Sequence, residues 1–431
     1  MQDLKGKKLL ILAGAPVHCK VVEAARALGV YTIVTDYLTN SPAKELADES
    51  WMLNIMDVDD IVERCKSEKV DGVLNFCIDP AQRPYVDICE KLGIPCYGTP
   101  EQVHILTDKP SFKAFCLQNG VDIIPTYTVE QVTDGSCEYP LFVKPTDSRG
   151  SRGQAVCYTK EETLSAISVA ARESSDGGVV IERFMQGKQD FSMTYFVCNG
   201  TPYLVRTCDR YLGKVEDGLN KQCVGCVGPS KYTDLYLKNV HGRVIEMIRA
   251  LGIQNGPVFM QGFVDGDTVR FYDPGLRFPG GEFERLLKDI TGIDLMSALV
   301  EFALTGSMTL PDGIEDAPYL LGGKHTIQLP ITARPGTVKA ISGLDNIRKD
   351  HRTTVAFSRY EVGETIPLTG DVRQRICEVA MITAPHESVC DAVSWVQSKL
   401  AVLDENNEDM LVSLVDPSIL NYENTEDNHA N

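Results

Sequence analysis

The segment YPLFVKPTDSRGSRGQAV contains the residue types that can hold a polyphosphate. A predicted strand carries Lys144 and Pro145. A loop of small and cationic residues follows it: Ser148, Arg149, Gly150, Ser151, Arg152 and Gly153. Glycines let backbone N–H groups approach phosphate oxygens, hydroxyls donate further hydrogen bonds, and fixed cations offset charge that is costly to desolvate. The spacing matches neither a P-loop nor a dinucleotide-binding fingerprint, so an ordinary exposed turn explains the loop equally well when it is taken alone.

Alternating strands and helices precede this loop. Residues 7–13 form an apolar run that ends in Gly14, and residues 18–28 follow with helical periodicity. The alternation continues with strand candidates at 31–35, 72–76 and 95–97 and helix candidates at 57–67 and 81–92. The pattern predicts an α/β fold in which residues 1–101 form a doubly wound, parallel-sheet domain.

The middle of the chain predicts a separate α+β section. Helices are expected at 107–118, 160–173 and 234–251. Two hairpins are expected, 191–198 with 201–207 through Asn199-Gly200, and 258–264 with 269–272 through Asp265-Gly266-Asp267.

The C-terminal part predicts a small β-rich domain at 317–403. Its strand candidates are separated by Gly and Pro turns and lie at 325–331, 337–341, 353–358, 364–366 and 376–383. From residue 404 the chain becomes polar and acidic, so 404–431 is expected to be a disordered tail.

The composition bounds the class of protein. The chain has 431 residues, of which 43% are hydrophobic, so it can bury the cores of several domains. Its 60 acidic and 42 basic residues give a net charge of -18, which argues against nucleic acid as a main partner. No apolar run approaches the roughly 20 residues that cross a bilayer, and no signal peptide is recognisable, so we expect no membrane partner and a cytoplasmic location. The 14 cysteines are scattered, and we expect them to be reduced, including those of the single Cys-x-x-Cys, Cys223 and Cys226.

Several short motifs follow one another along the chain: TDKPSFKAF, FVKP, VVIERFMQG, GKQDFSM and FYDPGLRFPGG. In this order they resemble the ATP-grasp superfamily, which includes biotin carboxylase, D-alanine:D-alanine ligase and the carbamoyl phosphate synthetase large chain. The resemblance covers roughly residues 5–400. It implies an ATP-grasp domain at 102–316 with a mobile subdomain at about 126–188, and its layout is most similar to the biotin carboxylase and carbamoyl phosphate synthetase branch.

The resemblance also implies roles for single residues. Lys109 and Lys144 match the two phosphate-binding cations of the family, and the glycine-rich loop matches its mobile phosphate loop. Glu182 matches the carboxylate near the adenine, and Arg183 and Phe184 lie along the linker that pairs with the base. Asp190 takes the place of the Glu that holds the ribose hydroxyls.

The metal site is expected at the second hairpin. Gln261 and Asp273 come from adjacent antiparallel strands, and oxygen ligands of this kind suit Mg²⁺ that also bridges nucleotide phosphates. The family pattern Glu-x-Asn-Pro-Arg is changed here to Asp273, Pro274, Gly275, Leu276 and Arg277, so one metal ion is expected, and a second requires another donor such as Glu282 or water. A hairpin-exit turn is the alternative explanation of Asp-Pro-Gly.

These residues together predict an ATP- and Mg²⁺-dependent carboxylate–amine ligase. A small-molecule carboxylate attacks the γ-phosphate of ATP, an acyl phosphate forms, and an amine displaces phosphate. Arg277 is expected where negative charge develops, and Arg210 is a candidate for substrate contact, with a surface arginine as its alternative. A homodimer is possible, with the helices near 286–304 as a candidate surface.

Two other functions stay open. A nucleotide sensor or scaffold that has lost turnover is suggested by the altered metal motif. An NAD-dependent oxidoreductase would use Gly14 and Asp36, but GAPVHC supplies one glycine of the three-glycine fingerprint, and Asp36 is expected to end a strand or cap a helix.

Overall fold

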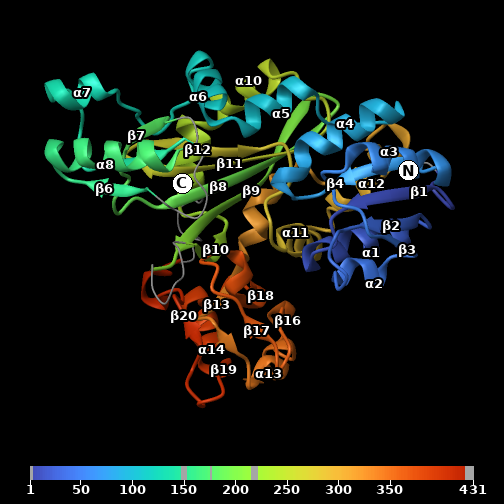
Figure 1. Ribbon diagram of the computed structural model, residues 1–431. Coiled ribbons are helices and arrows are strands. Elements are labelled where there is room, and N and C mark those ends of the chain that lie inside the picture. The colour runs from blue at the N-terminus through green and yellow to red at the C-terminus, as the bar shows by residue number, and fades with distance from the viewer. Residues whose placement is uncertain (1–2, 147–152, 175–176, 215–221, 423–431) are drawn as a thin grey trace, which may run out of the picture.

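The computed structural model describes residues 3–146, 153–174, 177–214 and 222–422. The chain forms an N-terminal α/β domain, a small lobe, a large central sheet and a C-terminal domain that extends from that sheet (Figure 1). The mixed α/β architecture expected from the sequence is confirmed.

The N-terminal domain is built on a parallel sheet with strand order β3-β2-β1-β4. Its strands are β1 (Lys8–Leu12), β2 (Tyr31–Thr35), β3 (Glu49–Trp51) and β4 (Gly72–Asn75), and its helices are α1 (Cys19–Ala27), α2 (Pro42–Leu46), α3 (Val58–Glu68) and α4 (Gln82–Leu92). The apolar strands are buried, as parallel strands covered by helices must be. The strand predicted at 95–97 is wrong, because Tyr97 leaves the sheet and is instead anchored by its hydroxyl, which donates to the Asn75 carbonyl at 2.6 Å.

Two helices lead from this domain to the small lobe. They are α5 (Pro100–Thr107), which begins with a capping box at Thr99, and α6 (Lys109–Gln118), capped by Asp108. The lobe contains an antiparallel sheet with order β6-β5-β7 and two helices. These elements are β5 (Leu141–Pro145), β6 (Ala155–Cys157), β7 (Val179–Arg183), α7 (Val129–Asp134) and α8 (Lys160–Glu173). The lobe has an apolar core of its own around Leu141, Val143 and Ile181.

A nine-stranded sheet forms the centre of the molecule. Eight strands run in the order β12-β11-β8-β9-β10-β13-β18-β16, and β20 (Leu411–Val412) pairs with β13. The strands of the central part are β8 (Asp190–Cys198), β9 (Thr201–Leu212), β10 (Cys223–Gly228), β11 (Gly256–Asp265) and β12 (Thr268–Gly275). The C-terminal part adds β13 (His325–Ala333), β16 (Thr353–Ser358) and β18 (Arg375–Thr383). The β-rich C-terminal domain expected at 317–403 therefore continues the central sheet rather than forming a separate one.

The two faces of the central strands differ in character. On one face, Phe191 of β8 packs its ring against Tyr236 at 5.2 Å between centroids. Tyr236 belongs to α9 (Thr233–Asn239), which is followed by α10 (His241–Ala250). The single helix predicted at 234–251 is thus two helices, because Val240 leaves the helical conformation with φ of −124°. The other face carries polar side chains and is described below.

The helices α11 (Phe283–Thr291) and α12 (Leu295–Thr305) join the central sheet to the N-terminal domain. Residues 295–304 of α12 are all buried, and the helix packs against α1 and β4. The prediction that the 286–304 region offers a dimer surface is therefore wrong for α12, because the chain itself already covers that helix.

The C-terminal domain is less purely β than the sequence predicts. Besides the shared sheet it contains short strands β14 (Gly336–Thr337), β15 (Ala340–Ser342), β17 (Thr365–Ile366) and β19 (Ala401–Leu403), and helices α13 (Leu344–Arg348) and α14 (Val389–Lys399). The tail predicted to be disordered from 404 is ordered up to 422, because β20 pairs with β13 and the Tyr422 hydroxyl donates to Asp209 at 2.7 Å. Residues 423–431 lie outside the described residues. Among the described helices, none has the length and apolar character required to cross a membrane.

Candidate active site

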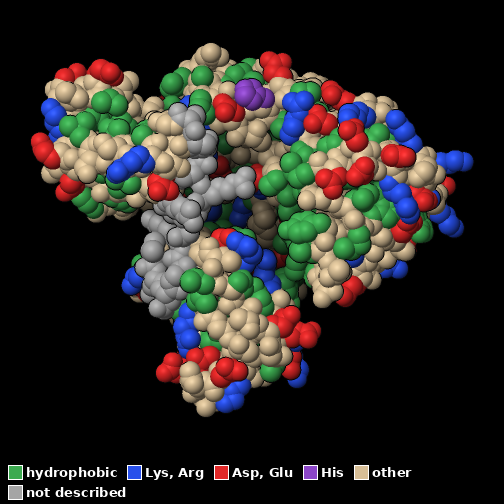
Figure 2. Space-filling model, in the orientation of Figure 1, with side chains coloured by type: hydrophobic (Ala, Val, Ile, Leu, Met, Phe, Trp, Pro, Cys, Tyr) green, Lys and Arg blue, Asp and Glu red, His purple; other side chains and the backbone are tan. Residues whose placement is uncertain are grey.

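The polar face of the central sheet borders a hollow between the lobes of the molecule. Figure 2 shows this hollow near the centre of the view, with Lys and Arg side chains on its walls. The residues predicted to bind nucleotide, metal and substrate come from strands β5, β7, β8, β9, β11 and β12 and from the first turn of α6. They form three groups, which we describe in turn.

The first group lies on the small lobe, where two lysines share one buried carboxylate. Glu182 of β7 is 5% exposed and accepts a hydrogen bond at 2.6 Å from Lys144 of the neighbouring strand β5. Its other oxygen pairs with Lys113 of α6. Burial raises the pKa of Glu182, but the two ammonium groups outweigh it and hold the pKa below its ordinary value. The group therefore keeps an excess of one positive charge beside the strand that leads into the glycine-rich loop.

Lys113 was missed in the sequence, although it stands four residues after Lys109 in the same helix, a spacing that puts both on one helix face. Burial lowers the pKa of the Lys113 ammonium, and Glu182 opposes this effect. Lys113 thus joins the small lobe to α6 through Glu182.

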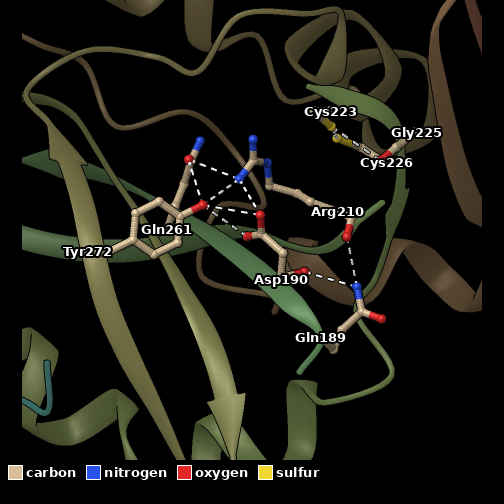
Figure 3. A network of polar contacts seen from close by, with 8 residues as sticks. All are labelled: Gln189, Asp190, Arg210, Cys223, Gly225, Cys226, Gln261 and Tyr272. Atoms are coloured by element: carbon tan, nitrogen blue, oxygen red, sulfur yellow. Dashed lines mark hydrogen bonds and ion pairs between the residues drawn. The ribbon is translucent and has the colours of Figure 1, made fainter. Parts of the chain in front are cut away.

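The second group is a hydrogen-bond network around Arg210 of β9, shown in Figure 3. The Nη1 atom of Arg210 donates to Asp190 at 2.8 Å, to Gln261 at 2.9 Å and to Tyr272 at 2.8 Å. The Tyr272 hydroxyl also contacts Asp190 at 3.1 Å and Gln261 at 3.3 Å. Asp190 is 2% exposed, and burial raises its pKa to about 6 although Arg210 acts in the opposite direction.

This network bears on two expectations. Asp190 is expected to hold ribose hydroxyls, and Arg210 is expected to contact substrate. In the structure, however, Arg210 donates a hydrogen bond to Asp190, so the two side chains are paired with each other. Tyr272 was not predicted, because successive residues of a strand face opposite sides, so a regular strand with Asp273 facing the site would turn Tyr272 away from it. A β-bulge between Gln261 and Gly262 leaves Tyr272 without a cross-strand partner and turns its hydroxyl toward Asp190.

The third group contains the predicted metal ligands. Gln261 and Asp273 lie on the adjacent antiparallel strands β11 and β12, as expected, and the β-bulge at Gln261 makes them direct cross-strand partners. Asp273 is half-buried, and its carboxylate forms no hydrogen bond or ion pair within the described part of the chain. Burial raises the pKa of Asp273, and the charge of Lys109 opposes the rise. Lys109 is exposed at the start of α6 and likewise has no ion-pair partner among the described residues.

Arg277 lies at the end of this group but is already paired. Arg277 is 7% exposed. Its guanidinium stacks on the Phe259 ring at 4.5 Å and binds both oxygens of Asp79 in a bidentate pair, with Nη2 to Oδ2 at 2.7 Å. Asp79 comes from the N-terminal domain just beyond β4, and its side chain is 60% exposed. Arg277 therefore connects the central sheet to the N-terminal domain.

Most residues of the predicted glycine-rich loop cannot be placed. Ser148, Arg149, Gly150, Ser151 and Arg152 lie outside the described residues. Gly153 is described and has φ of +68°, a conformation that favours glycine.

The linker residues are held by backbone hydrogen bonds of their own. The N–H groups of Arg183 and Phe184 donate to the carbonyls of Pro125 and Pro140 at 2.9 and 2.7 Å, so these amides are not open to a base in this conformation. The Arg183 side chain donates to Asp265 at 3.1 Å, away from the Lys144 group.

Two other sequence-based expectations can be placed. All fourteen cysteines are free, and the Sγ atoms of Cys223 and Cys226 lie 3.4 Å apart beside the Arg210 network. No group of three or more His, Cys, Asp or Glu side chains in residues 3–146, 153–174, 177–214 and 222–422 is arranged to hold a metal by itself. The carboxylate of Asp36 is occupied by the backbone amides of Gly14 and Leu38, at 2.8 and 2.9 Å, as expected for a strand-end residue.

Comparisons with known proteins agree with this arrangement. Residues 108–268 match the family model described as the carbamoyl-phosphate synthase L chain, ATP binding domain. A formate-dependent phosphoribosylglycinamide formyltransferase from Maridesulfovibrio salexigens is 22% identical over 332 residues, which cover 72% of this chain and 82% of that protein. The protein of the same name from Prochlorococcus marinus is 25% identical over 43% of this chain and only 50% of its own length.

Solved structures show the same fold over nearly the whole chain. Phosphoribosylglycinamide synthetase from Anaerococcus prevotii has a TM-score of 0.75 at 18% identity, covering 93% of this chain and 100% of its own. An L-amino acid ligase from Bacillus licheniformis has a TM-score of 0.72 at 19% identity, with coverages of 93% and 100%. The biotin carboxylase domain of Hydrogenobacter thermophilus 2-oxoglutarate carboxylase, solved with MgADP and bicarbonate, has a TM-score of 0.72 at 18% identity, with coverages of 94% and 91%. Residues 108–268 are therefore similar to an ATP-binding domain of the carbamoyl-phosphate synthase L chain, and the chain as a whole has the ATP-grasp fold of these ligase and biotin carboxylase structures.

Proposed function

We propose that the protein is an ATP- and Mg²⁺-dependent carboxylate–amine ligase that acts on small molecules through an acyl phosphate. The observation that carries the proposal is the half-buried Asp273 carboxylate, which has no hydrogen-bond or ion-pair partner among the described residues and whose pKa burial raises against the charge of Lys109. A buried carboxylate without a counter-ion is unfavourable unless a cation joins it. The names of the relatives support the reaction class, because they include an L-amino acid ligase and a phosphoribosylglycinamide synthetase.

The residues present fit one magnesium ion. Asp273 and Gln261 are cross-strand partners, and both side chains carry the hard oxygen donors that Mg²⁺ accepts; the Gln261 oxygen also accepts from Arg210 and Tyr272. Two protein ligands are enough, because Mg²⁺ usually completes its shell with water and nucleotide phosphates. When bound, the ion would neutralise charge on the transferring phosphoryl group. Glu282 is not placed to assist, because its carboxylate faces Lys20 and Arg285 at 3.7 and 3.5 Å.

The chain's own residues then bind and orient the reactants. Lys144 supplies positive charge from the small lobe, and Lys109, which has no ion-pair partner among the described residues, supplies it from the start of α6. The carboxylate oxygen of the acid forms a bond to the γ-phosphorus as the bond to ADP breaks. The amine nitrogen then forms a bond to the acyl carbon, phosphate leaves, and the amine loses a proton to solvent. Such transfer depends on positioning and electrostatics rather than on a protein nucleophile.

The test combines nucleotide binding with turnover. ATP with Mg²⁺ is expected to raise the melting temperature, and a panel of carboxylic acids with hydroxylamine as the amine is expected to release ADP and form a hydroxamate. The Asp273→Asn variant should keep ATP binding but lose about 100-fold or more in kcat, the typical loss when an electrostatic group of the transition state is removed. Asp289→Asn, an exposed position on α11, is the matched control and should behave as the wild type.

The same experiment decides between this proposal and its alternatives. ATP binding without ADP release from any acid would favour the nucleotide sensor, which the changed metal motif suggested. Stabilisation by NAD in place of ATP would favour the oxidoreductase.

A further inference from the structure

Three cysteine thiols lie together beside the Arg210 network, and the proposed reaction uses none of them. The Sγ atoms of Cys223 and Cys226 on β10 are 3.4 Å apart, as Figure 3 shows. Cys226 also interacts with Cys208 of the neighbouring strand β9. Cys223 and Cys226 are half-buried, whereas Cys208 is 1% exposed. Of these three thiols, Cys223 and Cys226 are therefore the ones that solvent reaches.

A β-bulge places Cys223 and Cys226 on one face of β10. Residues three apart in a regular strand point to opposite faces, with their Cα atoms about 10 Å apart. The register with β9 shifts just after Cys223, so that the two cysteines pair with Leu212 and Arg210, respectively. These partners are two residues apart on one face of β9, which corresponds to a Cα spacing of about 6.6 Å. A disulfide joins Cα atoms that are about 4.4–6.8 Å apart, so the bulge brings the two cysteines within its reach.

Two arginines beside the thiols favour the loss of a proton from Cys208. Arg206 and Arg210 flank Cys208 at alternate positions of β9, so the three side chains face the same side of the sheet. Burial raises the pKa of Cys208, but the hydrogen bond with Cys226 and the charges of the two arginines outweigh it and hold the pKa below its ordinary value. The same hydrogen bond is the main cause that raises the pKa of Cys226 to about 11. Cys208 therefore loses its proton first and can accept the proton of Cys226.

We propose that Cys223 and Cys226 form a reversible disulfide by exchange with a small-molecule disulfide, and that this bond weakens the proposed metal site through Arg210. Cys226 gives its proton to Cys208 and attacks the small disulfide, whose S–S bond breaks and releases a thiolate. Cys223 then attacks the Cys226 sulfur, and the second small thiol leaves with the proton of Cys223. Cys208 passes its proton to the first thiolate. The two protein thiols are thus oxidised by two electrons, and the small disulfide is reduced to two thiols.

The disulfide acts on the metal site through the strand partner of Cys226, and this part of the inference rests on the proposed function. Bond formation brings the two sulfurs from 3.4 Å to about 2.05 Å and draws Cys226 toward Cys223. Arg210 pairs with Cys226 across the strands and donates to the Gln261 oxygen at 2.9 Å. At a site that depends on positioning, a displacement of about 1 Å costs up to about 100-fold in rate. Oxidation therefore lowers both the affinity for Mg²⁺ and turnover, and reduction restores them.

The disulfide can be detected without any measurement of activity. The full-length protein is equilibrated with oxidised glutathione, treated with a maleimide in denaturant and digested with trypsin. Trypsin leaves Cys223 and Cys226 in one peptide, residues 222–231, and Cys208 in another, residues 207–210. The first peptide should be unlabelled and two hydrogens lighter, the second should keep its label, and dithiothreitol should restore both labels of the first. Two labels on peptide 222–231 after oxidation, or a link between the two peptides, would overturn the inference.

Serine variants separate the steps of the exchange. Cys226→Ser lacks the attacking thiol, so oxidised glutathione should leave its Mg²⁺ dependence and turnover unchanged. Cys223→Ser cannot close the disulfide and should keep glutathione on Cys226 as a mixed disulfide. Cys208→Ser should form the disulfide about 10-fold or more slowly at neutral pH, because the proton acceptor is lost. Cys390→Ser, at a half-buried position of α14, is the control and should respond to oxidation as the wild type does.

The effect on the metal site is measured by binding as well as by turnover. With ADP present, the melting temperature is followed across a Mg²⁺ titration, and the oxidised protein should need about 10-fold more Mg²⁺ than the reduced protein. The kcat for ADP release should fall about 10- to 100-fold on oxidation and recover with dithiothreitol. If the disulfide forms but the Mg²⁺ dependence of ADP binding is the same in both forms, the inference is wrong. The ligase proposal is judged separately, by ADP release from the reduced protein, which does not depend on the disulfide.

Discussion

The substitution Asp190→Asn gives a direct test of the Arg210 network. The Asp190 carboxylate is 2% exposed, and burial raises its pKa from 3.8 to about 6 despite Arg210. The folded protein therefore holds the Asp190 proton more tightly than the unfolded chain does. The stability contributed by this proton is fully present below pH 3.8 and is lost as the pH rises to about 6. A shift of this size corresponds to about 3 kcal/mol between the two limits.

Asparagine cannot titrate, and it keeps an amide oxygen that accepts from Arg210 and Tyr272. The free energy of unfolding of Asp190→Asn minus that of the wild type should therefore rise by about 3 kcal/mol between about pH 4 and pH 7. Urea unfolding followed by circular dichroism measures this difference, and subtraction removes the contributions of all other titrating groups. A difference that is flat, or that falls with pH, would show that Asp190 is a stabilised ion and that the network argument is wrong.

Asp265 provides the control for this experiment. Its carboxylate is also withdrawn from water, but Lys188 and Arg270 outweigh the effect of burial and lower its pKa to about 2. A lowered pKa contributes stability above the unfolded value, and that contribution is lost only as the pH falls toward 2. The Asp265→Asn difference should accordingly stay constant between about pH 4 and pH 7 while the Asp190→Asn difference changes.

Two further predictions concern the proposed active site. Lys144→Ala should weaken ATP binding about 30- to 100-fold by calorimetry, because it removes one charge-assisted contact. Lys238→Ala, at an exposed position of α9, should leave ATP binding unchanged. Equal losses of affinity in both variants would contradict the assignment of Lys144 to the ATP site. Gly275→Ala should destabilise the protein by about 1–3 kcal/mol in urea unfolding, because the new Cβ would lie 2.3 Å from the buried Phe259 ring. Gly280→Ala meets no atom within 4 Å, and a loss as large as that of Gly275→Ala would refute the packing argument.

Features set by neighbouring residues could be predicted from the sequence. The turn Asn199-Gly200 has positive φ at both residues, 49° and 78°, which is what its residue types favour. The second hairpin pairs Asp265 with Thr268 around its turn, as its turn residues favour, but Gln261 comes opposite Asp273 only because a β-bulge shifts the register by one residue. The helix predicted at 160–173 has those bounds as α8, since Thr159 caps it.

Features set by distant residues could not be predicted in this way. Arg277 and Asp79 are separated by 198 positions, and no local pattern marks them as partners. Glu182 belongs to the subdomain expected at about 126–188 and Lys113 lies outside it, and the two meet only because the small lobe packs beside α6. The acidic composition after 404 favoured disorder, but apolar residues such as Met410 within it are buried against the C-terminal core. The composition of a segment does not reveal which of its apolar residues pack against a distant core.

The ion pairs of the site differ in how easily a ligand can replace them. Asp190 is buried, so a ligand that took Arg210 from it would leave an unpaired carboxylate in a dry environment, at a cost of several kcal/mol. The side chain of Asp79 is 60% exposed, so water can solvate it when Arg277 turns away. Arg277 is therefore the cation that can exchange its partner for a phosphate or carboxylate, while Arg210 is fixed and orients Gln261. We therefore propose that Arg277 contacts the reacting groups directly, and that Arg210 acts through Gln261, which it orients.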